Sequence, residues 1–286
     1  MRTHATLLAG AIWLTATLAV AHPPVVQSAA AFASGLAGPE GLAFGKDGSL
    51  YVGTTTGDIR RVAPDGSHTL VASTGDRLAG LTMAKDGKIF ACAFNDNRVW
   101  SVDPETGAAS VYANVQSPNF VVQTRRGHVL ASSSFGGAIV DITYGANVPL
   151  ASGLSFPNGL AVRQRYLYVA LTGLNAVQRL RFVTPGVLGP PEPYASGLTI
   201  ADGIAFDAPG NLFVVGADKL YVVDRYTQAV QTIPDALYDW PSNLAFGRTT
   251  PYGKMTMFLV NFGPALGNGT TIVKAGTNHT GARLIR

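Results

Sequence analysis

The sequence contains a single cysteine, Cys92, in 286 residues. One cysteine cannot form an intramolecular disulfide, so covalent crosslinks within the chain do not stabilise the fold. Burial of apolar side chains must do so instead, and with 47% hydrophobic residues the chain has enough of them for one large domain. Cys92 itself lies in an apolar run typical of a strand, where we expect it to be buried.

Charged residues are also scarce, at 13% of the chain, and the formal net charge is +4. The arginines occur as scattered pairs, such as Arg60 with Arg61 and Arg125 with Arg126, rather than as a basic stripe. A nucleic-acid-binding protein would need such a stripe or a recognisable reading module, and the sequence has neither. We therefore expect no nucleic-acid partner.

Long apolar runs are absent except at the N-terminus. Arg2 precedes an apolar stretch from Leu7 to Val20, and small residues lead up to Ala21. This layout is typical of a cleavable signal peptide over residues 1–21, with cleavage after Ala21. The stretch is shorter than the roughly 20 residues of a membrane span, and two threonines interrupt it. We expect a secreted or periplasmic protein with no membrane span.

The rest of the chain, residues 22–286, is built from six copies of one unit of about 40 residues. Each copy has short runs of β-branched and aromatic residues, separated by Asp-Gly, Gly-Asn or Gly-Asp steps that supply the positive φ angles of tight hairpins. A small four-stranded sheet cannot bury its faces until neighbouring copies stack around an axis. The repeat therefore predicts an all-β fold, a six-bladed β-propeller with four antiparallel strands per blade. The blades start near residues 40, 79, 119, 158, 202 and 242.

One apolar run, Ala30–Ser34, precedes the first copy and has no blade of its own. We predict that it closes the ring as the outer strand of the sixth blade, because a ring must hide its unpaired strand edge. The C-terminal segment Ala282–Arg286 is the alternative for the same edge.

The inner strands of a propeller surround a central channel, so one repeat position in every blade faces a common point on the axis. That position is occupied by Glu40, Ala79, Asn119, Asn158, Asp202 and Ser242. Two carboxylates and two amides form an oxygen-only donor set with two negative charges, which suits a hard divalent cation and above all Ca²⁺. Zinc would require imidazole or thiolate ligands, which are missing there.

An ordinary turn role is the alternative for these residues, because Asn or Asp before Gly is common in turns. Four oxygen donors at one repeat position are harder to attribute to turns, however. Glutamate is also rare, with three in the chain, and a carboxylate without a partner would be costly inside the ring. We therefore predict that Glu40, Asn119, Asn158 and Asp202 bind one divalent cation.

Three short segments carry a resemblance: Pro39-Glu40-Gly41, Pro157-Asn158-Gly159 and Asp202-Gly203. They resemble the metal-ligand motifs of the SMP-30/gluconolactonase/LRE-like propellers of the calcium-dependent phosphotriesterase superfamily. The resemblance implies that Glu40, Asn158 and Asp202 bind the metal and that Asp202 is the general base. Ser117-Pro118-Asn119 resembles the segment in which the Asn is a fourth ligand or contacts the substrate.

Two departures from the related enzymes bear on the substrate. Ser117 stands where sugar lactonases carry an arginine, and none of the five histidines is placed like the histidine pair of paraoxonase-like enzymes. The resemblance thus implies a fold and a metal rather than a sugar lactone.

The ends of the second strands return to the same end of the channel as the ring. The predicted substrate contacts lie there or beside the ring: Ser117, Asn119, Thr54, Phe94, Ser133, Thr172 and Asn261. Such a mixed, fairly apolar pocket suits a small neutral ester or lactone. We expect a monomeric metal-dependent hydrolase in which the metal polarises the carbonyl and Asp202 acts on the attacking water.

Two alternatives remain open. A propeller of this kind could be a non-catalytic binding protein with a structural metal, because fold alone does not determine function. Gly38-Pro39-Glu40, Tyr51-Val52-Gly53 and Gly57-Asp58-Ile59-Arg60 also resemble strictosidine-synthase-like enzymes. That resemblance implies formation of a C–N bond without a metal, and it leaves the two carboxylates and two amides of the ring without a purpose.

Overall fold

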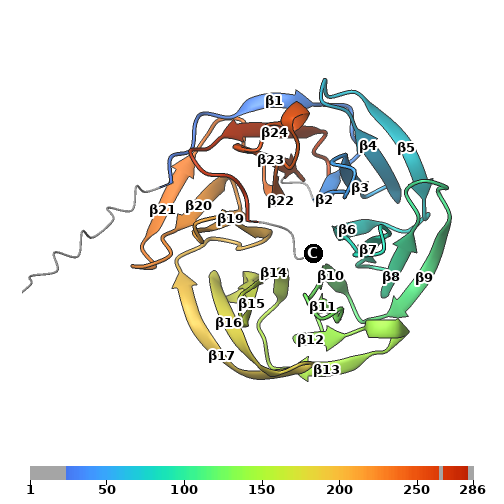
Figure 1. The fold of residues 1–286 in the computed structure, drawn as a ribbon, viewed down its shortest axis with the longest axis vertical. Coiled ribbons are helices and arrows are strands. Elements are labelled where there is room, and N and C mark those ends of the chain that lie inside the picture. The colour runs from blue at the N-terminus through green and yellow to red at the C-terminus, as the bar shows by residue number, and fades with distance from the viewer. Residues whose placement is uncertain (1–23, 264–266, 283–286) are drawn as a thin grey trace, which may run out of the picture.

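A computed structural model describes residues 24–263 and 267–282. Six four-stranded antiparallel sheets surround one axis, as Figure 1 shows, so the predicted six-bladed propeller is confirmed. The described residues contain no helix that is long and apolar enough to cross a membrane. The predicted signal peptide, residues 1–21, lies outside the described residues.

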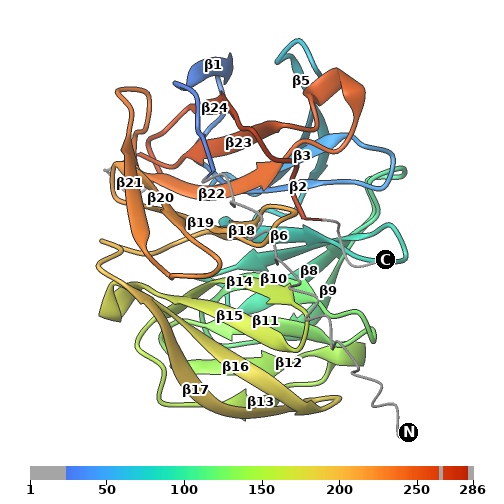
Figure 2. The same ribbon diagram turned by 60° about the vertical axis from the view of Figure 1, so that its left-hand side comes forward.

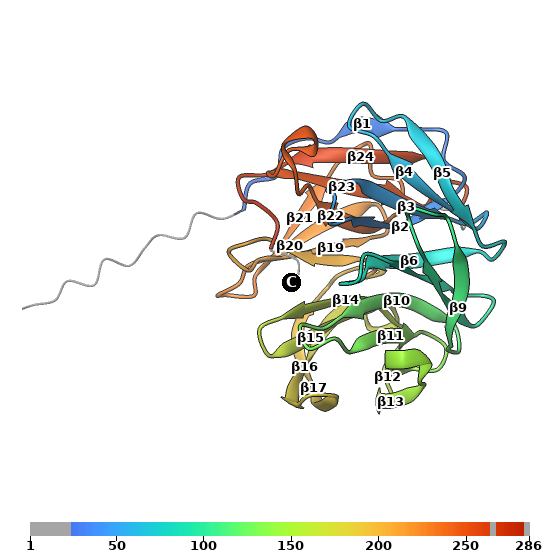
Figure 3. The same cartoon turned by 45° about the vertical axis from the view of Figure 1, so that its right-hand side comes forward.

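The inner strands surround the axis and the outer strands form the rim (Figure 1), and Figures 2 and 3 show the same sheets in two turned views. The inner strands are β2 (Pro39–Phe44), β6 (Leu78–Met83), β10 (Pro118–Gln123), β14 (Pro157–Arg163), β18 (Ile204–Phe206) and β22 (Pro241–Phe246). The second strands are β3 (Leu50–Thr54), β7 (Ile89–Ala93), β11 (Val129–Ser133), β15 (Tyr166–Leu171), β19 (Leu212–Gly216) and β23 (Thr256–Asn261).

The third strands are β4 (Asp58–Val62), β8 (Arg98–Val102), β12 (Ala138–Asp141), β16 (Ala176–Thr184), β20 (Lys219–Val223) and β24 (Thr271–Gly276). The outer strands are β5 (His68–Ser73), β9 (Ala109–Asn114), β13 (Val148–Ala151), β17 (Val187–Ser196), β21 (Val230–Pro234) and β1 (Ala30–Ala33). Three short 3₁₀ helices complete the described elements: Thr143–Gly145, Thr172–Leu174 and Thr250–Tyr252.

The N-terminal strand closes the ring, as predicted. Strand β1 pairs antiparallel with β24, which completes the sheet of blade six. Of the alternative C-terminal segment, only Ala282 lies within the described residues. Its N–H donates to the carbonyl of Phe206 in blade five, 2.8 Å away, and Gly281 forms a bridge with Asp207. The last described residues thus pair with blade five rather than with the edge of blade six, for which the C-terminal segment was the alternative.

The core of the described structure lies between the blades. Each of six hydrophobic clusters joins side chains of two neighbouring blades, and Cys92 is buried in the cluster between blades two and three. The second strands β3, β7, β11 and β19 are buried along their whole length, because a blade covers each of their faces. That double cover explains why their sequences are continuous apolar or small runs rather than alternating ones.

Candidate functional site

A β-bulge lies at the ring position of the inner strands. In β2, Pro39 pairs with Thr54 and Gly41 with Gly53, so Glu40 is an extra residue in the ladder. The same register shift occurs at the ring positions of β6, β10, β14 and β22. An inserted residue interrupts the alternation of side chains and redirects its own. The bulges thus give the ring residues a local geometry that the strand period does not encode.

Blade five has the same irregularity just before β18. The N–H of Asp202 donates to the carbonyl of Val215 at 2.8 Å, and the N–H of Val215 donates to the carbonyl of Gly203 at 3.0 Å. Asp202 and Gly203 therefore both lie opposite Val215, as in a β-bulge. Asp202 thus has the same local setting as the ring residues of the other blades.

Glycines next to the ring allow neighbouring blades to approach closely. A Cβ on Gly41 would lie 2.4 Å from the carbonyl oxygen of Ala79, and one on Gly159 would lie 2.3 Å from that of Asp202. Real Cβ atoms do not come so near, so these positions require glycine. The Asn158-Gly159 step, which has the composition of a turn, is therefore used here for packing between blades four and five.

The ring is continuous through blades five, six and one. A Cβ on Gly203 would lie 2.6 Å from the carbonyl oxygen of Ser242. The hydroxyl of Ser242 donates to the backbone carbonyl of Glu40 at 2.9 Å. The ring positions of blades five, six and one therefore lie next to one another, at the start of or just before their inner strands.

The ring contains two carboxyl groups, those of Glu40 and Asp202. Burial raises the pKa of Glu40 to about 7, and the Arg77 guanidinium opposes that rise. Burial, and then the charge of Glu40, raise the pKa of Asp202 well above its usual range, whereas a hydrogen bond from Asn158 lowers it. Protein surrounds both carboxyl groups, although each residue keeps some accessible surface. A pair of carboxyls that disfavour each other's charge is the electrostatic setting that a cation would relieve.

The amide oxygen of Asn158 provides a direct test of whether these residues fit a cation. Its Oδ1 is buried and has no hydrogen-bond partner, while its Nδ2 donates to Thr172 Oγ1 at 3.3 Å. A buried oxygen without a donor is costly unless something else satisfies it. Oxygen donors of this kind, next to two carboxylates, fit a hard divalent cation.

Of the six ring residues, only Glu40 and Asp202 have side chains of the types that most often hold metals, which are His, Cys, Asp and Glu. Within residues 24–263 and 267–282, no group of three or more His, Cys, Asp and Glu side chains could hold a metal ion. The fit therefore depends on the amide oxygens of Asn119 and Asn158, both of which are buried.

Several predicted substrate contacts use their polar groups locally. Ser133 Oγ donates to the carbonyl of Gln116 at 2.6 Å. The Asn261 amide accepts a hydrogen bond from the N–H of Asp239 at 3.2 Å and donates to the carbonyl of Leu237 at 2.8 Å. Thr54 Oγ1 likewise bonds the backbone of the following turn, and Thr172 Oγ1 donates to the carbonyl of Ala201. These groups shape the loops, and their contact with a substrate stays a prediction.

Arg77 is a residue that the sequence analysis missed. In blade three, the residue two positions before the ring is Ser117. The same offset in blade two is Arg77, whose guanidinium lies 5.5 Å from the ring centroid of Phe262 in blade six and acts on Glu40. The repeat itself contains this signal, because Arg77 and Ser117 occupy equivalent positions in neighbouring blades.

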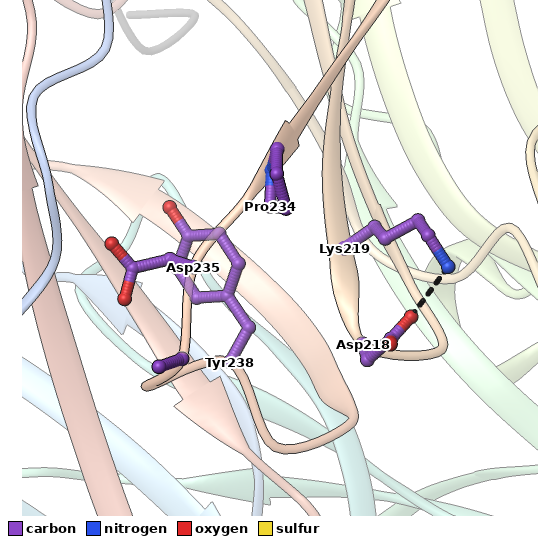
Figure 4. Close-up of a pocket in the computed structure, with 6 residues that line it drawn as sticks. Asp218, Lys219, Pro234, Asp235 and Tyr238 are labelled. Atoms are coloured by element: carbon purple, nitrogen blue, oxygen red, sulfur yellow. Dashed lines mark hydrogen bonds and ion pairs between the residues drawn. The ribbon is translucent and has the colours of Figure 1, made fainter.

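Two surface hollows lie away from the ring. Figure 4 shows the larger, of about 400 Å³, in which Lys219 and Asp218 form an ion pair at 2.7 Å. Its lining comes from the outer part of blade five: Asp218, Lys219, Pro234, Asp235, Ala236 and Tyr238. The other, of about 280 Å³, lies on blade six near Phe32 and Tyr252. Neither hollow contains a ring residue, and the ring, with its coupled carboxyls, remains the better candidate site.

Comparisons with known proteins agree with this architecture. A candidate gluconolactonase superposes with a TM-score of 0.76 at 18% identity, covering 90% of this chain and 94% of that one. A gluconolactonase from Xanthomonas campestris gives a TM-score of 0.73 at 18% identity, covering 87% and 89%. A calcium-binding regucalcin from Agrobacterium tumefaciens gives 0.71 at 16% identity, covering 88% and 93%. The chain has the fold of these propellers.

The resemblance to SMP-30/gluconolactonase-like propellers is thus confirmed at the level of the fold. A family profile described as strictosidine synthase-like, N-terminal, matches residues 29–62, which comprise β1 to β4. No curated protein matches the chain.

Proposed function

We propose that the protein is a secreted, divalent-metal-dependent hydrolase of a lactone or related ester. The unpartnered, buried Asn158 oxygen beside two coupled carboxyls is the observation that carries the proposal. Glu40, Asn119, Asn158 and Asp202 would hold the cation, for which Ca²⁺ is the choice that the oxygen donors favour. The likeness to gluconolactonases and to a calcium-binding regucalcin supports the same assignment.

In this mechanism the chain's own residues position a water and move its proton. When bound, the cation would polarise the substrate carbonyl and stabilise the charge that develops on its oxygen. Asp202 accepts a proton from the water as the water oxygen bonds to the carbonyl carbon. The C–O bond of the ester then breaks, and Asp202 returns the proton to the departing oxygen. Asn158 hydrogen-bonds to Asp202 and so orients that carboxyl.

The test combines metal analysis with a panel of lactones, aryl esters and phosphotriesters. We expect the purified protein to retain about one divalent cation per chain after saturation and desalting, and to release acid from at least one lactone or ester. Asp202→Asn should lower kcat by about 100-fold or more, because it removes the proton acceptor. Asp218→Asn, which changes an exposed carboxylate outside the ring, is the matched control. Unchanged hydrolysis in Asp202→Asn would show that Asp202 is not the base.

A strictosidine-synthase-like activity is the second candidate, because the matching profile covers residues 29–62 and includes Glu40. The two candidates differ in their need for metal. A synthase of that kind would join an amine to an aldehyde in the presence of a chelator, whereas the hydrolase would lose its activity there. The same metal-depleted preparation, offered both substrate classes, separates them.

The signal peptide forms part of the proposal. Expression of the full chain in a host with a secretory pathway should give a mature protein that begins at His22. N-terminal sequencing of the exported protein checks the cleavage site, and an intact N-terminus on the protein in the cytoplasm would contradict it.

A further inference from the structure

The residue two positions before the ring has a left-handed backbone in five of the six blades. These residues, with their φ angles, are Gly38 (60°), Ser117 (43°), Phe156 (52°), Ile200 (52°) and Trp240 (48°). Positive φ is uncommon outside glycine, and for a bulky or β-branched side chain it is a strained conformation. Strain of this kind persists only where the surrounding structure enforces it, and it concentrates at functional sites.

Hydrogen bonds enforce the conformation here. The N–H of Thr172 donates to the carbonyl of Phe156, and the N–H of Phe262 donates to that of Trp240, both at 3.1 Å. The N–H of Ile200 donates to Asn175 Oδ1 at 2.8 Å. Large apolar residues therefore keep this conformation two positions before the ring, although glycine would adopt it with less strain.

Phe156 is part of a continuous aromatic surface formed by three consecutive blades. The centroid of the Phe135 ring lies 5.4 Å from that of Phe94 and 5.5 Å from that of Phe156. The centroids of the Phe94 and Phe156 rings lie 6.3 Å apart. We call Phe94, Phe135 and Phe156 the aromatic wall. Phe135 keeps 68% of its surface exposed, so this cluster of three rings has a solvent-accessible apolar face.

The aromatic wall adjoins the proposed metal ligands. Phe156 is separated from Asn158 by one residue, and Phe94 directly follows β7, whose last residue pairs with Leu78 beside the ring. Ser134, the neighbour of Phe135, donates its hydroxyl to the carbonyl of Pro157 at 2.7 Å. A molecule held over the ring would therefore extend onto the wall from the blade-two to the blade-four side.

The chemistry of the wall limits what it can hold. Its three side chains have no hydrogen-bond donor or acceptor, so hydroxyl groups placed against them would lose their partners in water without gaining new ones. Aromatic rings with a free face instead bind alkyl chains or other rings. We propose that the aromatic wall binds an apolar alkyl or aryl substituent of the substrate, so that the enzyme acts on substituted, hydrophobic lactones or esters. This inference rests on the proposed hydrolase function.

The first experiment measures specificity with two lactones of the same ring size. We expect kcat/KM for γ-nonanolactone, which carries a pentyl chain, to exceed that for γ-butyrolactone by about 10-fold or more, as burial of several methylene groups would give. Phe135→Ala should reduce this ratio about 5- to 10-fold, and Phe135→Leu by less. Tyr144→Ala, which removes an aromatic side chain that is 97% exposed elsewhere on blade three, should leave the ratio unchanged. If Phe135→Ala leaves the ratio of the two kcat/KM values unchanged, the proposal is wrong.

The second experiment tests the aromatic wall independently of the proposed hydrolase function. Calorimetry compares binding of 5-pentyl-2-pyrrolidinone and 2-pyrrolidinone, lactams that share the shape of the two lactones and resist hydrolysis. One outcome is that no lactone is hydrolysed, that the pentyl lactam still binds about 10-fold more tightly than 2-pyrrolidinone, and that Phe135→Ala removes this difference. That outcome would support the proposal that the aromatic wall binds an apolar substituent and would contradict the proposed hydrolase function. If both lactams bind with the same affinity, the proposal that the aromatic wall binds an apolar substituent is wrong, whatever the result of the lactone assay.

Discussion

At the scale of single residues, the ring brings two carboxyl groups and a buried amide oxygen together at one end of the channel. Burial raises the pKa of Glu40 from 4.5 to about 7, and burial, followed by the charge of Glu40, raises the pKa of Asp202 well above its usual range. Folding of the metal-free protein is thus opposed by ionisation of both groups. A bound cation would remove that opposition, which links metal binding to stability.

The stability of the metal-free protein should therefore depend on pH in a defined direction. Because the pKa of Glu40 is higher in the folded protein, its contribution is fully present below pH 4.5 and is lost as the pH rises through about 7. We expect the melting temperature of the chelator-treated protein to fall between pH 5 and pH 7.5. Circular dichroism melts at these pH values measure it. Glu40→Gln, which cannot ionise, should reduce the slope, and an equal slope in that variant would exclude Glu40 as its source.

At the scale of elements, the hairpin turns do more than reverse the chain. The turn between β18 and β19 holds Asp207, which is fully buried. Its carboxylate accepts hydrogen bonds from the N–H groups of Gly210 and Asn211, both at 2.7 Å, and from His279 Nδ1 at 3.0 Å. One side chain thereby ties the turn of blade five to the C-terminal segment.

Asp207→Ala should destabilise the protein by about 2–4 kcal/mol, because it leaves several buried donors without a partner. The corresponding turn of blade two provides the control. There the exposed Asp86 accepts only one described bond, from the N–H of Lys88, so Asp86→Ala should cost less than about 1 kcal/mol. Chemical denaturation of both variants compares them, and equal losses would contradict a special role for Asp207.

Local sequence patterns predicted the existence of these elements well and their irregularities poorly. The Asp-Gly, Gly-Asn and Gly-Asp steps predicted the hairpins, because positive φ angles are a local requirement. The bulges at Glu40 and Ser242 left no local mark in the sequence, and only the pairing of β2 with β3 and of β22 with β23 reveals them. The hydroxyl of Ser133 and the amide of Asn261 also bond loop backbone that only the folded blade brings near, and their contact with a substrate stays a prediction.

At the scale of the whole molecule, stability depends on closing the ring. Strand β1 supplies the outer edge of blade six, and the preceding residues extend the contact: the N–H of Val25 donates to Asn278 Oδ1, and that of Ala29 donates to Asp235 Oδ2, both at 2.8 Å. The N-terminal segment thus touches blades five and six together. Each inter-blade cluster needs both of its blades, so an open edge would weaken the circle as a unit.

Removal of residues 1–34 should therefore lower the melting temperature by more than about 5 °C relative to the protein that begins at His22, since each kcal/mol lost corresponds to roughly 2–4 °C in a chain of this size. Calorimetry or a dye-based melt measures the difference. Adding the missing segment as a separate peptide should restore part of it, which distinguishes strand pairing from an effect of length. Equal melting temperatures would show that β1 is dispensable.

The sequence by itself left two candidates for the closing strand, but it determined the repeat, the number of blades and the six ring positions. These features follow from a period of about 40 residues and from the local needs of strands and turns. Only the tertiary structure placed Arg77 near Glu40 and Phe262, left Asn158 Oδ1 without a partner, and joined Phe94, Phe135 and Phe156 into one wall. The reason is physical: a repeat gives each residue its place within a blade, whereas contacts between blades depend on bulges, strained backbone and side-chain directions that form only when the ring closes.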